Sequence, residues 1–148
     1  MGREIVDDLG GDIAVLVSAV GTGAALMGVA DGLAKAGNSP KVIAVEPLQS
    51  PLLTTGTGGS HRVEGVGVGF EPPFLDRERL DGIRAVDQEK AFDMCRQLAR
   101  RAGILCGGST RLNVVAAIEL ARDFGPEKRI VTFGCDTGSK YLGGYIFE

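Results

Sequence analysis

The chain has 148 residues, of which 44% are hydrophobic and 24% charged, a balance typical of one folded domain with a core of its own. The net charge is only −3 and the basic residues are scattered, which argues against a protein that binds nucleic acid or a membrane surface. The longest apolar stretches, such as residues 13–20, are far shorter than the roughly 20 residues that span a bilayer, and no basic and apolar leader opens the chain. We therefore expect a cytoplasmic protein whose partners are small molecules or proteins.

Apolar runs and helical periods alternate along the first half of the chain. Residues 13–18 are expected to form a buried strand, and residues 41–47 a second one. Between them, Gly37 and Asn38 should end a helix that is indicated by apolar residues at helical spacing, namely Leu26, Val29, Ala30, Leu33 and Ala34. The Gly- and Pro-rich connection over residues 48–75 is long for a compact domain, which indicates a functional role.

The alternation continues after this connection. Residues 83–86 are expected to form a strand, and Asp87 is placed to cap a helix that ends at Gly103. A short strand, a helix and a last strand are then predicted at residues 104–106, 109–124 and 129–134. Strands joined through helices predict an α/β fold: a mainly parallel sheet with helices on both faces, in a single domain over residues 1–148. Such sheets bind ligands at the carboxyl ends of their strands.

The 23 glycines gather at turns between apolar runs, which is typical of ligand sites lined by backbone. The first cluster, GTGAALMG at residues 21–28, joins a strand to a helix, so backbone N–H groups and a helix N-terminus should surround one small volume. This arrangement favours a phosphate-bearing ligand. Two alternatives stay open: a tight turn without a ligand, and a dinucleotide site in which Glu46 binds ribose, although Leu26 breaks the G-x-G-x-x-G/A pattern.

Two further glycine clusters follow. VEGVGVGFEPPFLD at residues 63–76 has alternating glycines, so one face of an extended segment would carry no side chains and another group should approach its backbone closely. A flexible loop is the alternative. GILCGGST at residues 103–110 leads a strand into a helix and leaves Ser109 at the helix mouth, where a helix N-cap is the simplest interpretation.

Together these clusters resemble the second half of the cysteine synthase and cystathionine β-synthase family of fold-type II pyridoxal-phosphate (PLP) enzymes. GTGAALMG is similar to the family's GTGGT-type phosphate loop, SHRVEGVGVGF at residues 60–70 to its PHKIxGIGAGF-type segment, and GILCGGST to its GILxGGSSG-type turn. CDTGSKYL at residues 135–142 is similar to the closing PDSGERYL. The resemblance covers essentially the whole chain and implies the large-domain part of the tryptophan synthase β-like fold.

The resemblance implies a role around PLP for each cluster. The phosphate would be surrounded by the first turn, that is by Gly21, Thr22, Gly23, Ala24 and Ala25. The substrate pocket would be formed by Gly65, Val66, Gly67 and Gly69. Ser109 would face the pyridine nitrogen, and because a neutral hydroxyl does not hold that nitrogen protonated, the cofactor would suit β-elimination and replacement. The family's substrates are activated serines, and its nucleophiles are sulfide or small thiols.

The sequence also departs from the family. Ala25 stands where a threonine hydroxyl usually meets the phosphate. Arg111 stands where a glycine is usual, so either the turn after Ser109 differs or a cation lies near the site. The family's Schiff-base lysine belongs to the first half of the polypeptide, and its local context surrounds none of the lysines here, which are Lys35, Lys41, Lys90, Lys128 and Lys140. No catalytic residue is therefore assigned to this chain.

A missing lysine implies a missing half. The chain is expected to be a naturally split subunit, a truncated remnant or a fragment of a longer polypeptide, completed by an N-terminal half as a domain or partner subunit. Exposed apolar surface at the cleft would favour a homo- or hetero-oligomer. We expect PLP-dependent β-replacement in the assembled enzyme. The alternatives are a serine/threonine dehydratase or desulfhydrase, and a non-catalytic module that binds PLP or a partner.

The remaining polar and sulfur-containing side chains are expected to be structural. Three cysteines without Cys-x-x-Cys spacing and a single histidine predict reduced thiols and no metal site. His61 is expected at the surface or behind the site, and Cys106 and Cys135 in packing at strand ends. Asp136 is placed either to cap the final turn or to line the pocket, and the structural role is favoured.

Overall fold

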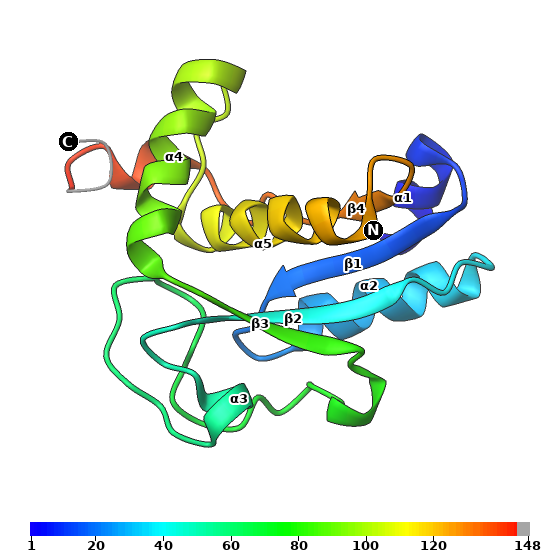
Figure 1. The fold of residues 1–148 in the computed structure, drawn as a ribbon, viewed down its shortest axis with the longest axis horizontal. Coiled ribbons are helices and arrows are strands. Elements are labelled where there is room, and N and C mark those ends of the chain that lie inside the picture. Colours follow the sequence, from blue (N-terminus) through cyan, green and yellow to red (C-terminus); the bar gives the residue numbers. More distant parts are fainter. Residues whose placement is uncertain (145–148) are drawn as a thin grey trace.

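A four-stranded parallel sheet forms the centre of the computed structural model, which describes residues 1–144. Its strands are β1 (Ile13–Ala19), β2 (Lys41–Pro47), β3 (Gly82–Val86) and β4 (Arg129–Val131), and they lie in the order β3-β2-β1-β4 (Figure 1). Every neighbouring pair is parallel. The predicted α/β class is therefore confirmed, and β1, one of the two inner strands, has its carboxyl end at the first glycine turn.

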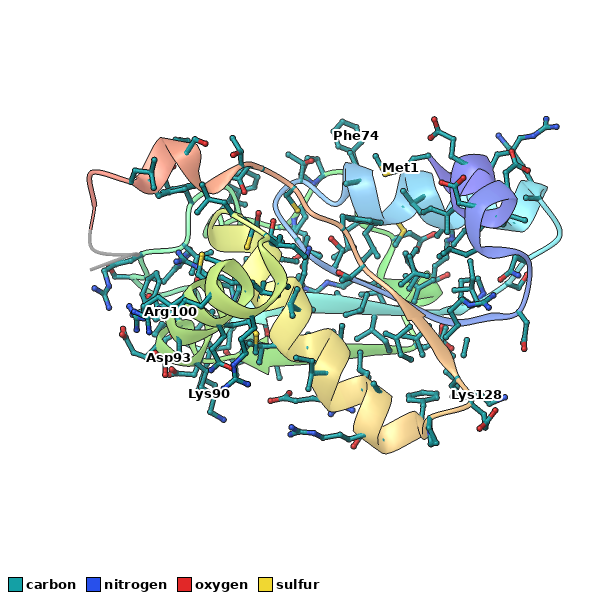
Figure 2. All side chains as sticks on the ribbon, turned by 90° about the horizontal axis from the view of Figure 1, so that it is seen from above. Met1, Phe74, Lys90, Asp93, Arg100 and Lys128 are labelled. Atoms are coloured by element: carbon teal, nitrogen blue, oxygen red, sulfur yellow. The ribbon has the colours of Figure 1, made fainter. Side chains whose placement is uncertain are left out.

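Helices cover both faces of this sheet, as Figure 2 shows. On one face lie α1 (Gly2–Leu9) and α2 (Ala24–Lys35), whose Leu26 and Leu33 pack with Leu16 of β1. On the other lies α5 (Gly108–Phe124), whose Leu112 packs with Val15 and Val17 of the same strand, while α4 (Gln88–Ala102) packs on α5. Because successive residues of β1 point to opposite faces and both faces are covered, the strand has a continuous apolar sequence.

Three helix boundaries form as predicted. Asp87 caps α4, and its Oδ1 accepts hydrogen bonds from the backbone N–H groups of Glu89 (2.8 Å) and Lys90 (3.2 Å). Gly103 ends the same helix with φ 67°, and Gly37 follows α2 with φ 78°, the left-handed conformation that favours glycine. No helix within residues 1–144 is long and apolar enough to cross a membrane.

The long connection between β2 and β3 is ordered at its start by Glu46. It contains the single-turn helix α3 (Leu52–Thr55) and the 3-10 turn η1 (Arg77–Arg79). The Glu46 carboxylate, only 2% exposed, accepts hydrogen bonds from the backbone of Leu53 (2.7 Å) and Thr54 (3.1 Å) and from the Thr54 hydroxyl. The carboxylate is thus buried under the connection and does not line the pocket beyond β1, which counts against the dinucleotide interpretation of Glu46.

Two predicted strands differ from the structure. Residues 104–106 do not join the sheet: Cys106 makes one isolated antiparallel bridge with Thr137, and the side chain of Ile104 is 50% exposed. This triplet bonds instead to the chain beyond β4: the Gly138 N–H donates to the Leu105 carbonyl oxygen (2.9 Å), and the pairing is too short to form a strand. The last strand is also shorter than predicted, because β4 ends at Val131 and the chain then bends towards α5.

Candidate functional site

A pocket of about 210 Å³ opens beyond the carboxyl end of β1, at the edge of the sheet where ligands were expected. It brings together the three glycine clusters, which are far apart in the sequence. The lining residues are Ser18, Ala19, Gly21, Thr22, Gly23, Ala25, Leu26, Gly65, Val66, Ser109 and Cys135. Seven predicted site residues therefore meet in one volume, whereas Ala24, Gly67 and Gly69 are not part of its lining.

The first glycine turn leaves the N-terminus of α2 open to a ligand. Gly23 is the N-cap, with φ 87°, and no side chain caps the helix. The nearest side-chain acceptor, the Thr22 hydroxyl, lies 3.5 Å from the Ala24 nitrogen, at the limit of hydrogen bonding. Apart from this long bond, no group within residues 1–144 caps the first turn of the 12-residue helix, and its remaining N–H groups are directed, with the positive end of the helix dipole, towards the pocket. This donor set fits a phosphate.

The second glycine segment packs directly on the first turn. The Gly67 N–H donates to the Val20 carbonyl oxygen (3.1 Å), and a Cβ on Gly21 would overlap the carbonyl oxygen of Gly65. The predicted close approach to this segment is thus confirmed. Its predicted extended shape is wrong, because the glycines at residues 65, 67 and 69 have φ values of 79°, 58° and 77°. Glycine is needed there for left-handed backbone, as well as for space at the neighbouring turn.

His61 holds this glycine segment in shape. Its Nε2 lies 3.0 Å from the Gly67 carbonyl oxygen, and its Nδ1 accepts a hydrogen bond from the Val63 N–H (3.2 Å). With Nδ1 as the acceptor, the tautomer that fits both contacts donates from Nε2 to the Gly67 carbonyl oxygen. The side chain is half-buried and lies outside the pocket lining, which agrees with the structural role expected for it.

Ser109 lies in the first turn of α5 and faces the pocket. The N-cap of this helix is Gly107, without a side-chain cap, so the simple interpretation of Ser109 as the N-cap is wrong. Arg111, two residues on, is 1% exposed: its Nε donates to the Gly108 carbonyl oxygen (3.1 Å), and its guanidinium lies 4.0 Å from the Phe92 ring centroid. The guanidinium group therefore supports the backbone of the first turn of α5, and Arg111 is not among the residues that line the pocket.

The turn before Ser109 depends on Asp136. A Cβ on Gly107 would overlap the carboxylate of this residue, whose Oδ2 accepts a hydrogen bond from the Tyr141 hydroxyl (2.8 Å). The Gly107 N–H also donates to the backbone oxygen of Asp136 (3.1 Å). Asp136 is therefore structural, as expected, although the N-cap of the closing 3-10 turn η2 (Gly138–Tyr141) is Thr137.

None of the five lysines belongs to the pocket. All of them are exposed, and Lys140 forms an ion pair with Glu64 (2.7 Å) that holds the pKa of its ammonium group above the usual value. The pocket also lacks a threonine hydroxyl at position 25, where the Ala25 methyl group lies. The geometry is therefore suited to holding an anion and an adjoining ring, and it offers no amine for covalent chemistry.

The three cysteines differ sharply in exposure, which gives a first testable prediction. Cys95 and Cys106 are 0% and 2% exposed, and burial raises the pKa of the Cys106 thiol to about 12. Cys135 is exposed and lines the pocket. Because the thiolate is the reactive form, iodoacetamide should alkylate Cys135 alone in the native chain. Intact-mass spectrometry should show one adduct under native conditions and three in denaturant; native modification of Cys106 would contradict this placement.

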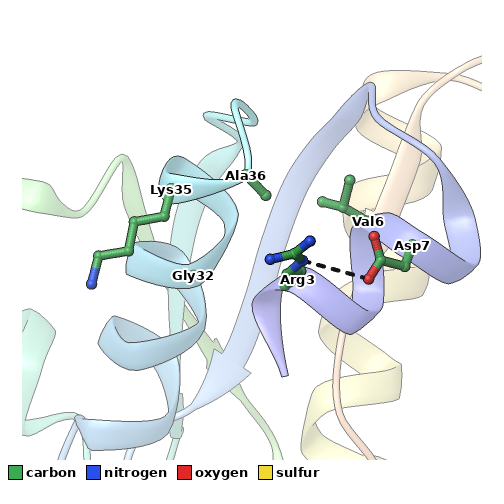
Figure 3. A pocket seen from close by; sticks show the side chains of 6 residues that line it. All are labelled: Arg3, Val6, Asp7, Gly32, Lys35 and Ala36. Atoms are coloured by element: carbon green, nitrogen blue, oxygen red, sulfur yellow. Dashed lines mark ion pairs between the residues drawn. The ribbon is translucent and has the colours of Figure 1, made fainter.

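A larger hollow lies elsewhere. It measures about 640 Å³ and is formed between α1 and the C-terminal end of α2, by Arg3, Val6, Asp7, Gly32, Lys35 and Ala36 (Figure 3). Its charged side chains are exposed, and Arg3 is paired with Asp7 at 3.9 Å. It lies a full helix length from the glycine turns and has no buried polar group directed into it. We therefore assign the functional site to the smaller pocket.

Several site residues could not be found by sequence reasoning. Ser18 and Leu26 line the pocket as parts of a predicted strand and a predicted helix, where the pattern indicates core positions, and Ala19 lies between that strand and the glycine turn. Asn113 is fully buried in α5 and binds backbone groups on two sides of the pocket, yet a single asparagine within a helical pattern carries no distinguishing signal.

Comparison with known proteins places these features in a family. A family model described as "Pyridoxal-phosphate dependent enzyme" matches residues 1–136. Cysteine synthase B of Campylobacter jejuni is 38% identical over 144 residues, which cover 97% of this chain and 48% of that protein. The chain thus spans about half the length of the curated relatives it matches.

Solved structures agree. The crystal structure of cysteine synthase from Entamoeba histolytica superposes with a TM-score of 0.90 at 34% identity, over 99% of this chain and 44% of that one. A hydrogen sulfide-producing enzyme from Fusobacterium nucleatum superposes with a TM-score of 0.91 at 33% identity, over 99% of this chain and 45% of that one. These findings confirm the predicted family and its cofactor, PLP. The chain belongs to the pyridoxal-phosphate dependent enzyme family, and cysteine synthases are among its relatives.

Proposed function

We propose that this chain is the phosphate-binding half of a PLP-dependent β-replacement enzyme of the cysteine synthase type. An N-terminal half, as a domain or as a partner subunit, would complete it. The completed enzyme would join sulfide or a small thiol to an activated serine. The observation that carries the proposal is the 210 Å³ pocket in which the first glycine turn, Ser109 and the second glycine segment meet. This second segment, with glycines at residues 65, 67 and 69, is called the Gly65 segment below. The likeness to cysteine synthases from two organisms supports the reaction class.

In this proposal the cofactor phosphate binds at the N-terminus of α2. The helix end carries an effective charge of roughly +0.5, and a hydrogen bond to a charged oxygen contributes about 1.5–3 kcal/mol, so a few N–H donors there suffice for binding. The Ala25 methyl group cannot donate, which costs about 1–3 kcal/mol relative to a hydroxyl that would donate to the phosphate. The affinity of the isolated chain for phosphate should accordingly be modest.

Ser109 would meet the other end of the cofactor. When bound, PLP supplies an electron sink that stabilises negative charge at the substrate α-carbon. The Ser109 hydroxyl, a neutral group in the first turn of α5, would hydrogen-bond the ring nitrogen without holding a proton on it. Gly65 and Val66 would border the ring on the substrate side, where the Gly65 backbone packs closely on Gly21.

The missing amine and the exposed apolar side chains next to the pocket support a partner. Phe74, whose backbone N–H donates to the Thr22 carbonyl oxygen (3.0 Å), is 63% exposed and projects from the ribbon in Figure 2. Phe70 is 55% and Val68 38% exposed in the preceding segment. We propose that the completing half covers this apolar rim and supplies the lysine. A monodisperse monomer that binds no apolar dye would contradict this part of the proposal.

One alternative activity has specific support. The enzyme from Fusobacterium nucleatum that produces hydrogen sulfide is about as similar to this chain as the cysteine synthase from Entamoeba histolytica is. A desulfhydrase would use the same pocket, with elimination from a thiol-bearing substrate in place of replacement. Assay of the completed enzyme with cysteine alone, and with an activated serine plus sulfide, would separate the two activities.

The proposed half-site predicts a distinct response to PLP and borohydride. The chain should bind pyridoxine 5′-phosphate, which has no aldehyde, and inorganic phosphate should compete with it. After incubation with PLP and reduction, mass analysis should find no single preferred lysine, because all five are exposed and outside the pocket. One stoichiometric adduct on one lysine would mean that this half carries its own catalytic amine. If the chain bound neither pyridoxine 5′-phosphate nor inorganic phosphate, the proposed phosphate site would be wrong.

A further inference from the structure

Asn113 makes hydrogen bonds to two different sides of the candidate pocket. Its side chain is completely buried in α5. The Oδ1 atom accepts a hydrogen bond from the Ala19 N–H at 2.6 Å. The Nδ2 atom donates to the Phe133 carbonyl oxygen at 3.0 Å and lies 3.5 Å from the Cys135 sulfur. One amide group therefore joins the end of β1, the chain beyond β4 and the helix that carries Ser109.

The position of this amide coincides with the place where two strands separate. β1 and β4 pair as far as Leu16 and Val131. Beyond that pair the Thr132 hydroxyl donates to the Val17 carbonyl oxygen (2.7 Å), so a side chain already replaces the backbone ladder. One step further, Asn113 bridges the gap between the two diverging chains. The pocket opens near this divergence, where Ala19 and Cys135 belong to its lining.

Thr110 adds a second link between the same elements. It is 4% exposed, and its hydroxyl accepts a hydrogen bond from the Cys135 N–H at 2.9 Å. Ala19, Ser109 and Cys135 all line the pocket. Because residues four apart lie on one face of a helix, Asn113 is one turn below Ser109 and moves with it. Ala19 lies two residues before Gly21, the first residue of the turn that we propose to bind phosphate (residues 21–25, called the phosphate-binding turn below).

We propose that Asn113 is a positioning residue that fixes the span between the phosphate-binding turn and Ser109. The inference deepens the proposed function and rests on it. PLP is a short, stiff molecule, so its phosphate and ring nitrogen can be met together only if the two walls are held at one separation. Misplacement by about 1 Å can cost on the order of a hundredfold in such sites. A polar bridge with directional bonds holds a separation more narrowly than apolar packing does.

The test compares two ligands. Pyridoxine 5′-phosphate should contact both the glycine turn at residues 21–25 and Ser109, whereas inorganic phosphate should contact the glycine turn alone. Asn113→Asp keeps the acceptor for the Ala19 N–H, removes the N–H donors and places a carboxylate oxygen against the Phe133 carbonyl. Affinity for pyridoxine 5′-phosphate should fall about tenfold or more, while affinity for inorganic phosphate should change less than about threefold. NMR titration measures both constants and reports folding in the same spectra. The matched control is Asn38→Asp, a buried asparagine beyond the far end of α2, which should change neither.

Each outcome decides between the two proposals. If a folded Asn113→Asp chain loses both affinities equally, or loses neither, the positioning role is wrong and the asparagine only supports the fold. If the wild-type chain binds neither ligand, the proposed phosphate site is wrong, and the wild-type titration alone shows it. Should Asn113→Asp not fold, Thr110→Val removes the second link with little change of shape. Thr110→Val should lower the affinity for pyridoxine 5′-phosphate relative to the affinity for inorganic phosphate. An unchanged ratio of these two affinities would overturn the inference.

Discussion

The Gly21→Ala variant should lose at least about tenfold in affinity for inorganic phosphate and about 2–3 kcal/mol in the free energy of unfolding. The new methyl group would overlap the Gly65 carbonyl oxygen, a backbone atom that cannot rotate away. The Gly65 segment and the phosphate-binding turn must therefore separate, which moves the N–H donors and opens the pocket to water. Calorimetric titration with phosphate and urea unfolding measure the two effects.

Gly28→Ala is the matched control for this variant. Gly28 is exposed in α2, the helix that follows the Gly21 turn, and a Cβ there meets nothing within 4 Å. Alanine is the better helix former by about 1 kcal/mol, so this change should raise stability slightly and leave phosphate affinity unaltered. If Gly21→Ala behaved like Gly28→Ala, the close packing of the two glycine segments would be refuted.

The Gly107→Ala variant should lower the free energy of unfolding by about 1–3 kcal/mol, because its methyl group would overlap the Asp136 carboxylate. To give way, the carboxylate must leave its buried position and its hydrogen bond from Tyr141 (2.8 Å). The first turn of α5, including Ser109, should shift with it. Urea unfolding measures the loss, and the chemical shifts of the Ser109 amide report the movement.

A double-mutant cycle identifies the cause. Gly107→Ala made in an Asp136→Ala background should cost much less than in the wild-type chain, because the atoms it would meet have been removed. Gly134→Ala, at an exposed glycine with nothing within 4 Å, should be nearly neutral. Equal costs in both backgrounds would show that the destabilisation comes from the backbone of the turn and not from Asp136.

Local chemistry explains which features the sequence could predict. The apolar run of β1, the Asp87 cap and Gly103 each act over a few residues, so their effect is visible in the sequence itself. The phosphate-binding turn belongs to the same class, because its glycines directly follow a strand and precede a helix. The resemblance of four short motifs to one family added the relative placement of the turns, which no local pattern contains.

Features that depend on distant contacts escaped prediction. The alternating glycines at residues 65, 67 and 69 suggested an extended segment, whereas their left-handed backbone follows from packing on His61 and the first turn. Residues 104–106 have strand-forming side chains but no neighbouring strand. Asn113 shows the limit most clearly, since its importance lies in hydrogen bonds to residues 19 and 133, 94 and 20 positions away.

The order of the strands also has a consequence for how the chain acquires its fold during synthesis. β1 lies at the centre of the sheet, and one of its neighbours, β4, is formed by Arg129–Val131, which pairs with residues 13–16. Translation runs from the N-terminus, so β1, β2 and β3 can assemble while β4 and Asn113 are still inside the ribosome or not yet made. Until then one edge of β1 stays open, with its backbone unpaired and prone to association with other chains. The last part of the site to form is therefore the side of the pocket that contains Ser109 and Cys135, which Asn113 joins to β1.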